Sequence, residues 1–72
     1  MEEFLKKIAD ILEAENLTAT DDLKALAQWD SLAVLSVIAM LDANYGVNLR
    51  AADFEPVNNV NELWKLVQSK KG

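Results

Sequence analysis

The stretch from residue 31 to residue 44 restricts the fold of this chain more than any other segment. Its apolar residues recur at helical spacing, and Asp42 is the one charged residue in it. At about 100° of rotation per residue, one arc of such a helix should face the core. That arc holds Val34, Val37, Ile38, Leu41 and Tyr45. Because Gly46 suits the left-handed turn that often closes a helix, we predict a helix over 31–44 that ends near this glycine.

The opposite arc of the predicted helix has no charged residue. It carries Leu32, Ser36, Ala39 and Ala43. A helix that is apolar on all sides is either central to a large core or docked against another molecule, and 72 residues are too few for the first arrangement. We therefore predict a partner-binding face formed by Leu32, Leu35, Ser36, Ala39, Met40, Asp42 and Ala43. The alternative is that the alanines only favour the helical conformation and that Leu32 folds over the start of the helix.

Asp30 and Ser31 form a polar pair at the start of this helix. The first turn of a helix has unpaired backbone N–H groups and the positive end of the helix dipole, so a phosphate esterified to Ser31 would be stabilised there. The alternative is that the two residues only cap the helix. Trp29 beside them could contact a group attached to Ser31 or a partner, or it could fill the interior at the end of the preceding loop.

The pattern before residue 31 predicts one further helix and a long connection. Apolar residues follow a helical period over 2–15, with charged residues on the other side. Residues 16–28 have no sustained period, and their spaced leucines should pin a loop to the core. Connections of this length are usually functional, and this one delivers the chain to Ser31.

The pattern after residue 46 predicts a short helix and a long one. The short helix over 51–55 must end before the proline that follows it, and Phe54 is its expected core anchor. Asn59 and Glu62 form a plausible capping box for the last helix, over 60–69. We therefore expect an all-α fold: one domain over residues 1–72, a small bundle of three main helices with a short third helix between the second and the last.

Composition argues against several classes of function. The net charge is −5, whereas nucleic-acid binders need clustered lysines and arginines, so we expect no nucleic-acid partner. The acidic character could steer basic enzyme surfaces towards the chain, or merely keep a small domain in solution. The chain has no histidine and no cysteine, so the usual base for activating Ser31 is absent. We expect a protein that is not an enzyme, with a serine–lysine pair of Ser31 and Lys24 as the remaining catalytic alternative.

We also expect neither a bound metal nor a membrane span. The acidic residues Asp21, Asp22, Asp53 and Glu55 could hold a divalent cation only loosely, and no run matches a calcium-binding loop. No stretch reaches the roughly 18 to 20 apolar residues that cross a bilayer, and the N-terminus lacks the basic start of a secretory signal. A soluble, cytoplasmic protein is the expectation.

A set of short motifs spans nearly the whole chain. They are Asp21-Asp22-Leu23, Trp29-Asp30-Ser31-Leu32, Leu41-Asp42, Tyr45-Gly46-Val47 and the closing series Val60, Leu63 and Val67. In these motifs the chain resembles the acyl carrier proteins of the phosphopantetheine-binding family, and in particular the stand-alone type. The resemblance implies 4′-phosphopantetheine attached covalently to Ser31, with Asp30 and Leu32 beside it. The terminal thiol of this arm would carry acyl groups as thioesters.

The resemblance also implies the partners. A phosphopantetheinyl transferase would load Ser31 from coenzyme A and would contact Asp30. The further partners would be the enzymes that load and process the acyl group, in a fatty-acid, polyketide-like or specialised lipid pathway. Because docking of this kind is transient, we expect a monomer. Two alternatives stay open: an aminoacyl or peptidyl carrier of a small dedicated pathway, and an unmodified helical protein-interaction domain.

The chain departs from the family pattern at several positions. Many fatty-acid carriers have a glycine where this chain has Gln28, and fatty-acid synthase carriers tend to have glutamates where it has Ser36, Asp42 and Ala43. Only one of these three positions on the predicted helix is acidic. We therefore expect a dedicated set of partner enzymes and no interchange with a general fatty-acid synthase.

Overall fold

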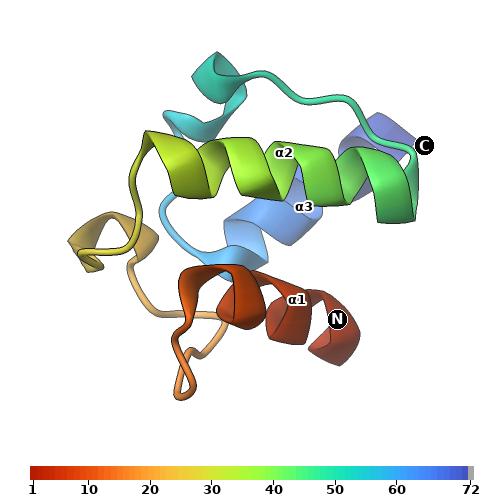
Figure 1. The fold of residues 1–72 in the computed structure, drawn as a ribbon. Coiled ribbons are helices and arrows are strands. Elements are labelled where there is room, and N and C mark those ends of the chain that lie inside the picture. The colour runs from red at the N-terminus through yellow and green to blue at the C-terminus, as the bar shows by residue number, and fades with distance from the viewer. Residues whose placement is uncertain (72) are drawn as a thin grey trace.

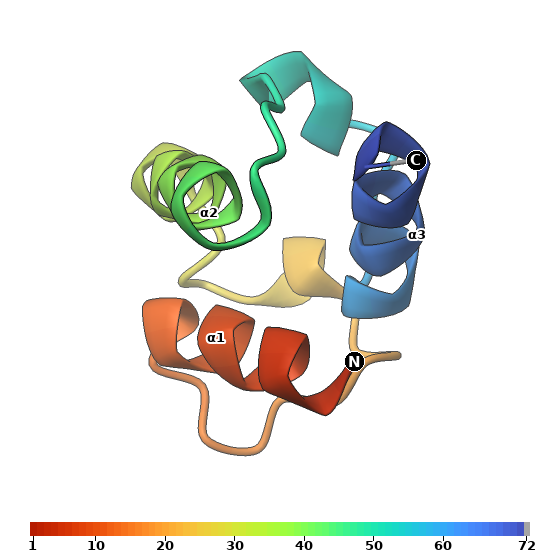
Figure 2. The same ribbon diagram turned by 90° about the vertical axis from the view of Figure 1, so that its right-hand side faces the viewer.

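The computed structural model describes residues 1–71 of the 72-residue chain. The elements in this range are all helical, in the order α1 (Glu2–Leu12), η1 (Leu23–Ala25), α2 (Ser31–Tyr45), η2 (Ala51–Phe54) and α3 (Val60–Lys71), where η marks a 3₁₀ helix. In Figure 1, α2 lies above α1, and α3 lies behind them. Figure 2 looks along α2 and shows η2 above the space between α2 and α3. In Figure 1, η1 lies to the left of the three α-helices. The predicted all-α class is confirmed.

The helix α1 is shorter than the predicted 2–15. It ends at Leu12 because Glu13 adopts a left-handed conformation, with φ 53° and ψ 39°. The Ala14 N–H then returns to the Ala9 carbonyl at 3.0 Å, which turns the chain back beneath the helix. The prediction was wrong here because no glycine marks this turn, and Ala14 continues the helical pattern.

The helix α2 runs one residue further than predicted, and its closure is as expected. Gly46 adopts the left-handed conformation, with φ 65° and ψ 28°, and its N–H donates to the Asp42 carbonyl at 3.2 Å. Val37 and Leu41 are fully buried, and Val34, Ile38 and Tyr45 pack half-buried against the core. The predicted core arc of this helix is therefore confirmed.

The connection between α1 and α2 is pinned to the core, as predicted, but it is not irregular throughout. It contains the short helix η1, whose first residue, Leu23, is fully buried. The Leu23 N–H donates to the Asn58 carbonyl at 2.8 Å, and the Asn61 N–H donates to the Ala19 carbonyl at 3.1 Å. These bonds attach the loop to the start of α3. The pattern did not reveal η1, because a single 3₁₀ turn is too short to set a period.

The last two elements lie close to their predicted positions. Phe54, at the end of η2, is buried as the expected anchor. The Glu62 N–H donates to Asn59 Oδ1 at 2.9 Å, which caps α3 as expected. The Glu62 carboxylate, however, accepts from the Asn58 N–H at 2.7 Å, not from Asn59, and α3 continues beyond residue 69 to Lys71.

An aromatic cluster joins the three α-helices at the end of α2 remote from Ser31. The Phe4 ring lies 4.8 Å from the Trp64 ring and 5.7 Å from the Tyr45 ring, measured between centroids. Tyr45 and Trp64 lie 6.1 Å apart, close to perpendicular. Such contacts add to the burial of the apolar core. None of the helices in the described part of the chain combines the length and apolar character that a membrane crossing requires.

Candidate functional site

Asp30 fixes where α2 begins. Its backbone is extended, with φ −130° and ψ −174°, and its Oδ1 atom accepts the Ala33 N–H at 2.9 Å. Its main-chain carbonyl accepts the Val34 N–H at 3.0 Å, which is the first hydrogen bond of the helix. The carboxylate therefore occupies one of the donors that a helix start leaves unpaired. Ser31 becomes the first residue inside the helix.

Ser31 is exposed at this helix start. Within residues 1–71, the N–H groups of Ser31 and Leu32 have no protein acceptor. The first turn of α2 contains no acidic residue. Unpaired amides and the positive end of the helix dipole favour an anion bonded to the serine oxygen. The geometry thus suits a phosphodiester on Ser31, on the outside of the protein where an enzyme can reach it.

The structure gives Ser31 no catalytic partner among the described residues. The Lys24 ammonium, considered above as a possible partner, donates to the main-chain carbonyl of Glu55. The sequence has no histidine or cysteine that could replace it. No group of three or more acidic side chains within residues 1–71 is arranged to hold a metal ion. Among the described residues, the structure therefore gives no base bonded to the Ser31 hydroxyl.

Trp29 belongs to the interior and not to the open side of the site. Its ring lies 6.2 Å from the Phe54 ring at an angle of 47°, and the side chain packs half-buried against the core. Of its two possible roles, the structure favours that of a plug at the end of the loop. It thereby holds the residues that precede Asp30 against η2.

The surface of α2 next to Ser31 is largely uncharged. Leu32 is 73% exposed and Leu35 is 57% exposed, so two large apolar side chains lie on this surface. Ser36, Ala39, Asp42 and Ala43 are also exposed, whereas Met40 is half-buried and packs against the core. The exposure of Leu32 shows that it does not fold over the helix start. The residues predicted for the partner-binding face therefore lie on one accessible side, with Met40 at its edge.

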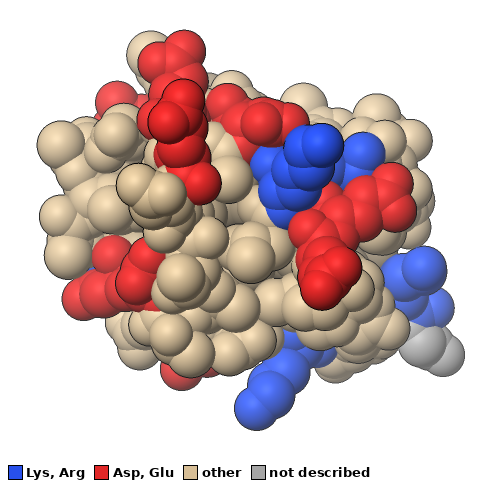
Figure 3. Space-filling view, turned by 90° about the horizontal axis from the view of Figure 1, so that it is seen from below, with Lys and Arg blue, Asp and Glu red and all other residues tan. Residues whose placement is uncertain are grey.

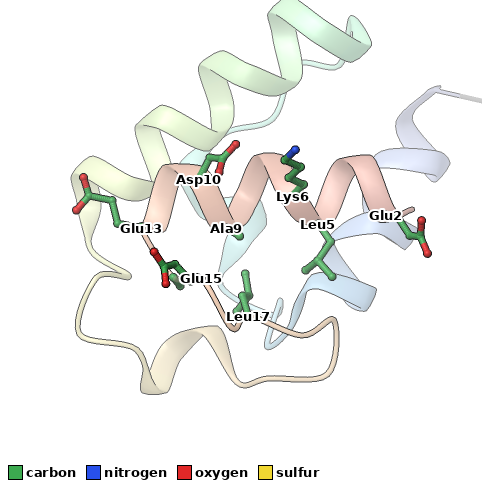
Figure 4. A pocket seen from close by; sticks show the side chains of 9 residues that line it. Glu2, Leu5, Lys6, Ala9, Asp10, Glu13, Glu15 and Leu17 are labelled. Carbon is green, nitrogen blue, oxygen red and sulfur yellow. The ribbon is translucent and has the colours of Figure 1, made fainter.

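A second feature was not anticipated from the sequence. A groove of about 630 Å³ lies along α1, and none of its lining residues comes from α2. Figure 4 shows that it is bounded by α1 and by the chain that returns beneath it after Glu13. The groove depends on the left-handed turn at Glu13, and the sequence carries no signal for that turn.

The family model described as a phosphopantetheine attachment site matches residues 2–67. A relative from Streptomyces avermitilis, named polyketide-8 synthase acyl carrier protein 2, is 29% identical over 73 residues, which cover 99% of this chain and 84% of the relative. No solved structure matches the chain. The matched range includes all of α1 and α2, and with them Ser31 at the start of α2.

Proposed function

The chain belongs to the phosphopantetheine-binding family, and on this premise we propose that Ser31 is the residue that bears the prosthetic arm. The chain is an acyl carrier protein: it holds 4′-phosphopantetheine covalently and is a carrier, not a catalyst. Once attached, the arm supplies a terminal thiol that carries acyl groups as thioesters. The single observation that supports Ser31 is its exposed position as the first residue of α2, beside unpaired amides.

Loading requires one phosphoryl-type transfer. Ser31 Oγ forms a bond to the phosphorus next to the pantetheine of coenzyme A, while the bond from this phosphorus to the adenosine bisphosphate part breaks. The serine proton passes to the phosphopantetheinyl transferase, since Lys24 is engaged by Glu55 and this chain offers Ser31 no base. The amides of Ser31 and Leu32 then lie next to the charge of the new phosphodiester.

Asp30 and Leu32 have separate roles in this proposal. Asp30 holds Ser31 at the helix start through the bond to the Ala33 N–H, and it is a contact for the transferase. Leu32, the next residue in the helix, offers an exposed apolar side chain. The two residues position the site and do not take part in bond formation.

We propose that enzymes which load and process the acyl group bind the partner-binding face. Its exposed leucines give apolar contact, and its single carboxylate, at Asp42, gives little attraction for a basic surface. An acidic helix would suit the enzymes of a general fatty-acid synthase better, so a dedicated partner set follows. The Streptomyces relative supports a pathway of the polyketide type. Transient docking of this kind suits a monomeric carrier.

Intact-protein mass measurement tests the attachment residue. After incubation with coenzyme A and a purified broad-specificity transferase, the wild-type chain should gain the mass of one phosphopantetheine group. Ser31→Ala should gain none. Ser69→Ala is the matched control, since Ser69 is an exposed serine on α3, and it should be loaded like the wild type. An equal mass gain on Ser31→Ala would refute the assignment.

A further inference from the structure

The groove along α1 is held open by the backbone. Because α1 stops at Leu12 and Glu13 turns to the left-handed region, residues 14–17 run back under the helix. The Ala14 N–H is bonded to the Ala9 carbonyl at 3.0 Å, and the Leu17 N–H is bonded to the Ala14 carbonyl at 3.2 Å. These backbone bonds fix the course of the returning chain, which forms one side of the groove. Its volume of about 630 Å³ lies in the range of ligand-binding clefts.

The groove has an apolar floor and an acidic rim. Leu5 and Leu17 converge between α1 and the returning chain, with the side chain of Ala9 close by (Figure 4). The charged side chains that line the groove are four carboxylates and one ammonium group: Glu2, Asp10, Glu13, Glu15 and Lys6. Figure 3 views the molecule from below and shows acidic groups around a largely uncharged middle, with basic groups beside them on the right and at the lower edge.

We propose that this groove is a second docking surface, which binds a basic segment of a partner protein with apolar side chains between lysines or arginines. The apolar floor accepts the apolar side chains, and the rim, with an excess of three negative charges, attracts the flanking cations. This surface is separate from the partner-binding face of α2. Its existence does not depend on whether Ser31 is modified.

The charge of the rim favours a basic protein segment over two other possible occupants of the groove, a second copy of the chain and an acyl chain. A second copy of the chain carries a net charge of −5, so the acidic groove repels it at long range. An acyl chain would fit the floor but would leave the four carboxylates without a role. A basic, partly apolar protein segment is the one occupant that uses both parts of the groove.

Amide chemical shifts measured on the whole chain, without the prosthetic arm, test the proposal. The probe is the blocked peptide Lys-Lys-Leu-Leu-Lys-Lys, and the comparison peptide has glycines in place of the leucines. The leucine peptide should shift the amides of Ala9, Ala14 and Leu17 more than those of Leu32 and Leu35. The glycine peptide should bind more weakly at the same amides, because it lacks the apolar contact with the floor.

Two charge-reversal variants distinguish binding in the groove from non-specific attraction between the basic peptide and the acidic protein. Asp10→Lys changes the rim, and Glu55→Lys makes the same change in net charge at an exposed residue outside the groove. Lysine near the C-terminal end of α1 also suits the helix dipole, so Asp10→Lys should fold, which its circular dichroism checks. We expect Asp10→Lys to raise the peptide Kd by about three- to tenfold, and Glu55→Lys to raise it by less than about twofold.

Several outcomes overturn the proposal. The proposal fails if both charge reversals weaken peptide binding equally, or if the two peptides bind equally well. It also fails if the peptide shifts mainly the amides of Leu32 and Leu35. Shifts of the groove amides that depend on protein concentration, without peptide, would indicate that a second copy binds there. Shifts of the groove amides by hexanoyl-pantetheine alone would assign the groove to cargo and overturn it as well. Loading of Ser31, followed by mass, is measured separately, so failure of the groove proposal leaves the attachment site untouched.

Discussion

The Asp30 carboxylate accepts the Ala33 N–H at 2.9 Å, which places a capping bond directly beneath the exposed Ser31. The same aspartate thus serves the stability of α2 and the position of the acceptor serine. These two roles can be separated by substitution.

Asp30→Ala should lower the free energy of unfolding by about 1 kcal/mol, since the first turn of α2 loses its side-chain acceptor. Asp30→Ser restores an acceptor of similar reach and should recover most of this loss. Urea denaturation followed by circular dichroism measures both. If the transferase contacts the aspartate itself, Asp30→Ser should remain slow to load although its stability is restored. Equal stability of the alanine variant and the wild type would contradict the capping role.

Leu32→Glu should leave the fold almost unchanged and should slow loading of Ser31. Leu32 is 73% exposed, so its replacement removes little buried area, but it places a charge beside the acceptor. The rate of phosphopantetheine transfer, followed by mass, gives the measurement, with Leu32→Met as the apolar control. Unchanged loading kinetics would count against a contact between this residue and the transferase.

Glu13→Gly should raise the free energy of unfolding by roughly 0.5 to 1 kcal/mol. Glu13 has φ 53°, a conformation that costs little for glycine and more for residues with a Cβ atom. Glu13→Ala removes the carboxylate and keeps the Cβ atom, so it should show no comparable gain. An equal gain in both variants would mean that the charge, and not the backbone conformation, is responsible.

Gly46→Ala should destabilise the protein by about 1 kcal/mol. An added Cβ atom at Gly46 has nothing within 4 Å, so the cost comes only from holding alanine at φ 65°. Thermal unfolding monitored by circular dichroism is the measurement. A loss several times larger than this would point to a steric clash that the structure does not contain.

Ionisation of Tyr45 should lower the free energy of unfolding of the protein at alkaline pH. Burial of the phenol, and then the negative charge of Glu3, raise the pKa of Tyr45 above its ordinary value of 10.0. Because the folded state favours the neutral phenol, its contribution is fully present below pH 10.0 and is lost as the pH rises through the pKa of the folded protein. The wild type should therefore lose stability more steeply than Tyr45→Phe above this pH.

The pKa itself can be measured directly, because Tyr45 is the only tyrosine in the chain. Phenolate absorbance of the folded protein should report a pKa above that of the same protein in denaturant. Parallel pH profiles of stability for the wild type and Tyr45→Phe would contradict the raised pKa.

Residues with strong local preferences explain why much of the fold could be predicted. Asp30 and Gly46 mark the two ends of α2, and Asn59 with Glu62 marks the start of α3. The aspartate also places Ser31 at a helix start from the residue pattern alone. Ser31 is the first residue of α2, which agrees with that prediction.

The groove along α1 shows why the rest could not be predicted. Its shape depends on a left-handed turn at Glu13, a glutamate with no local preference for that conformation. The hydrogen bond from Leu23 to Asn58 joins residues far apart in the sequence. Neither feature leaves a periodic trace in the sequence, because the first is a turn at a single residue and the second joins two distant segments.

The bonds that tie residues 19 and 23 to Asn61 and Asn58 connect an early part of the chain to a late one. During synthesis, Ser31 leaves the ribosome before either asparagine is available to anchor the loop that leads to it. An enzyme that recognises the finished surface around this serine would therefore act only after both asparagines have been synthesised and packed. Chains that lack them would escape the modification.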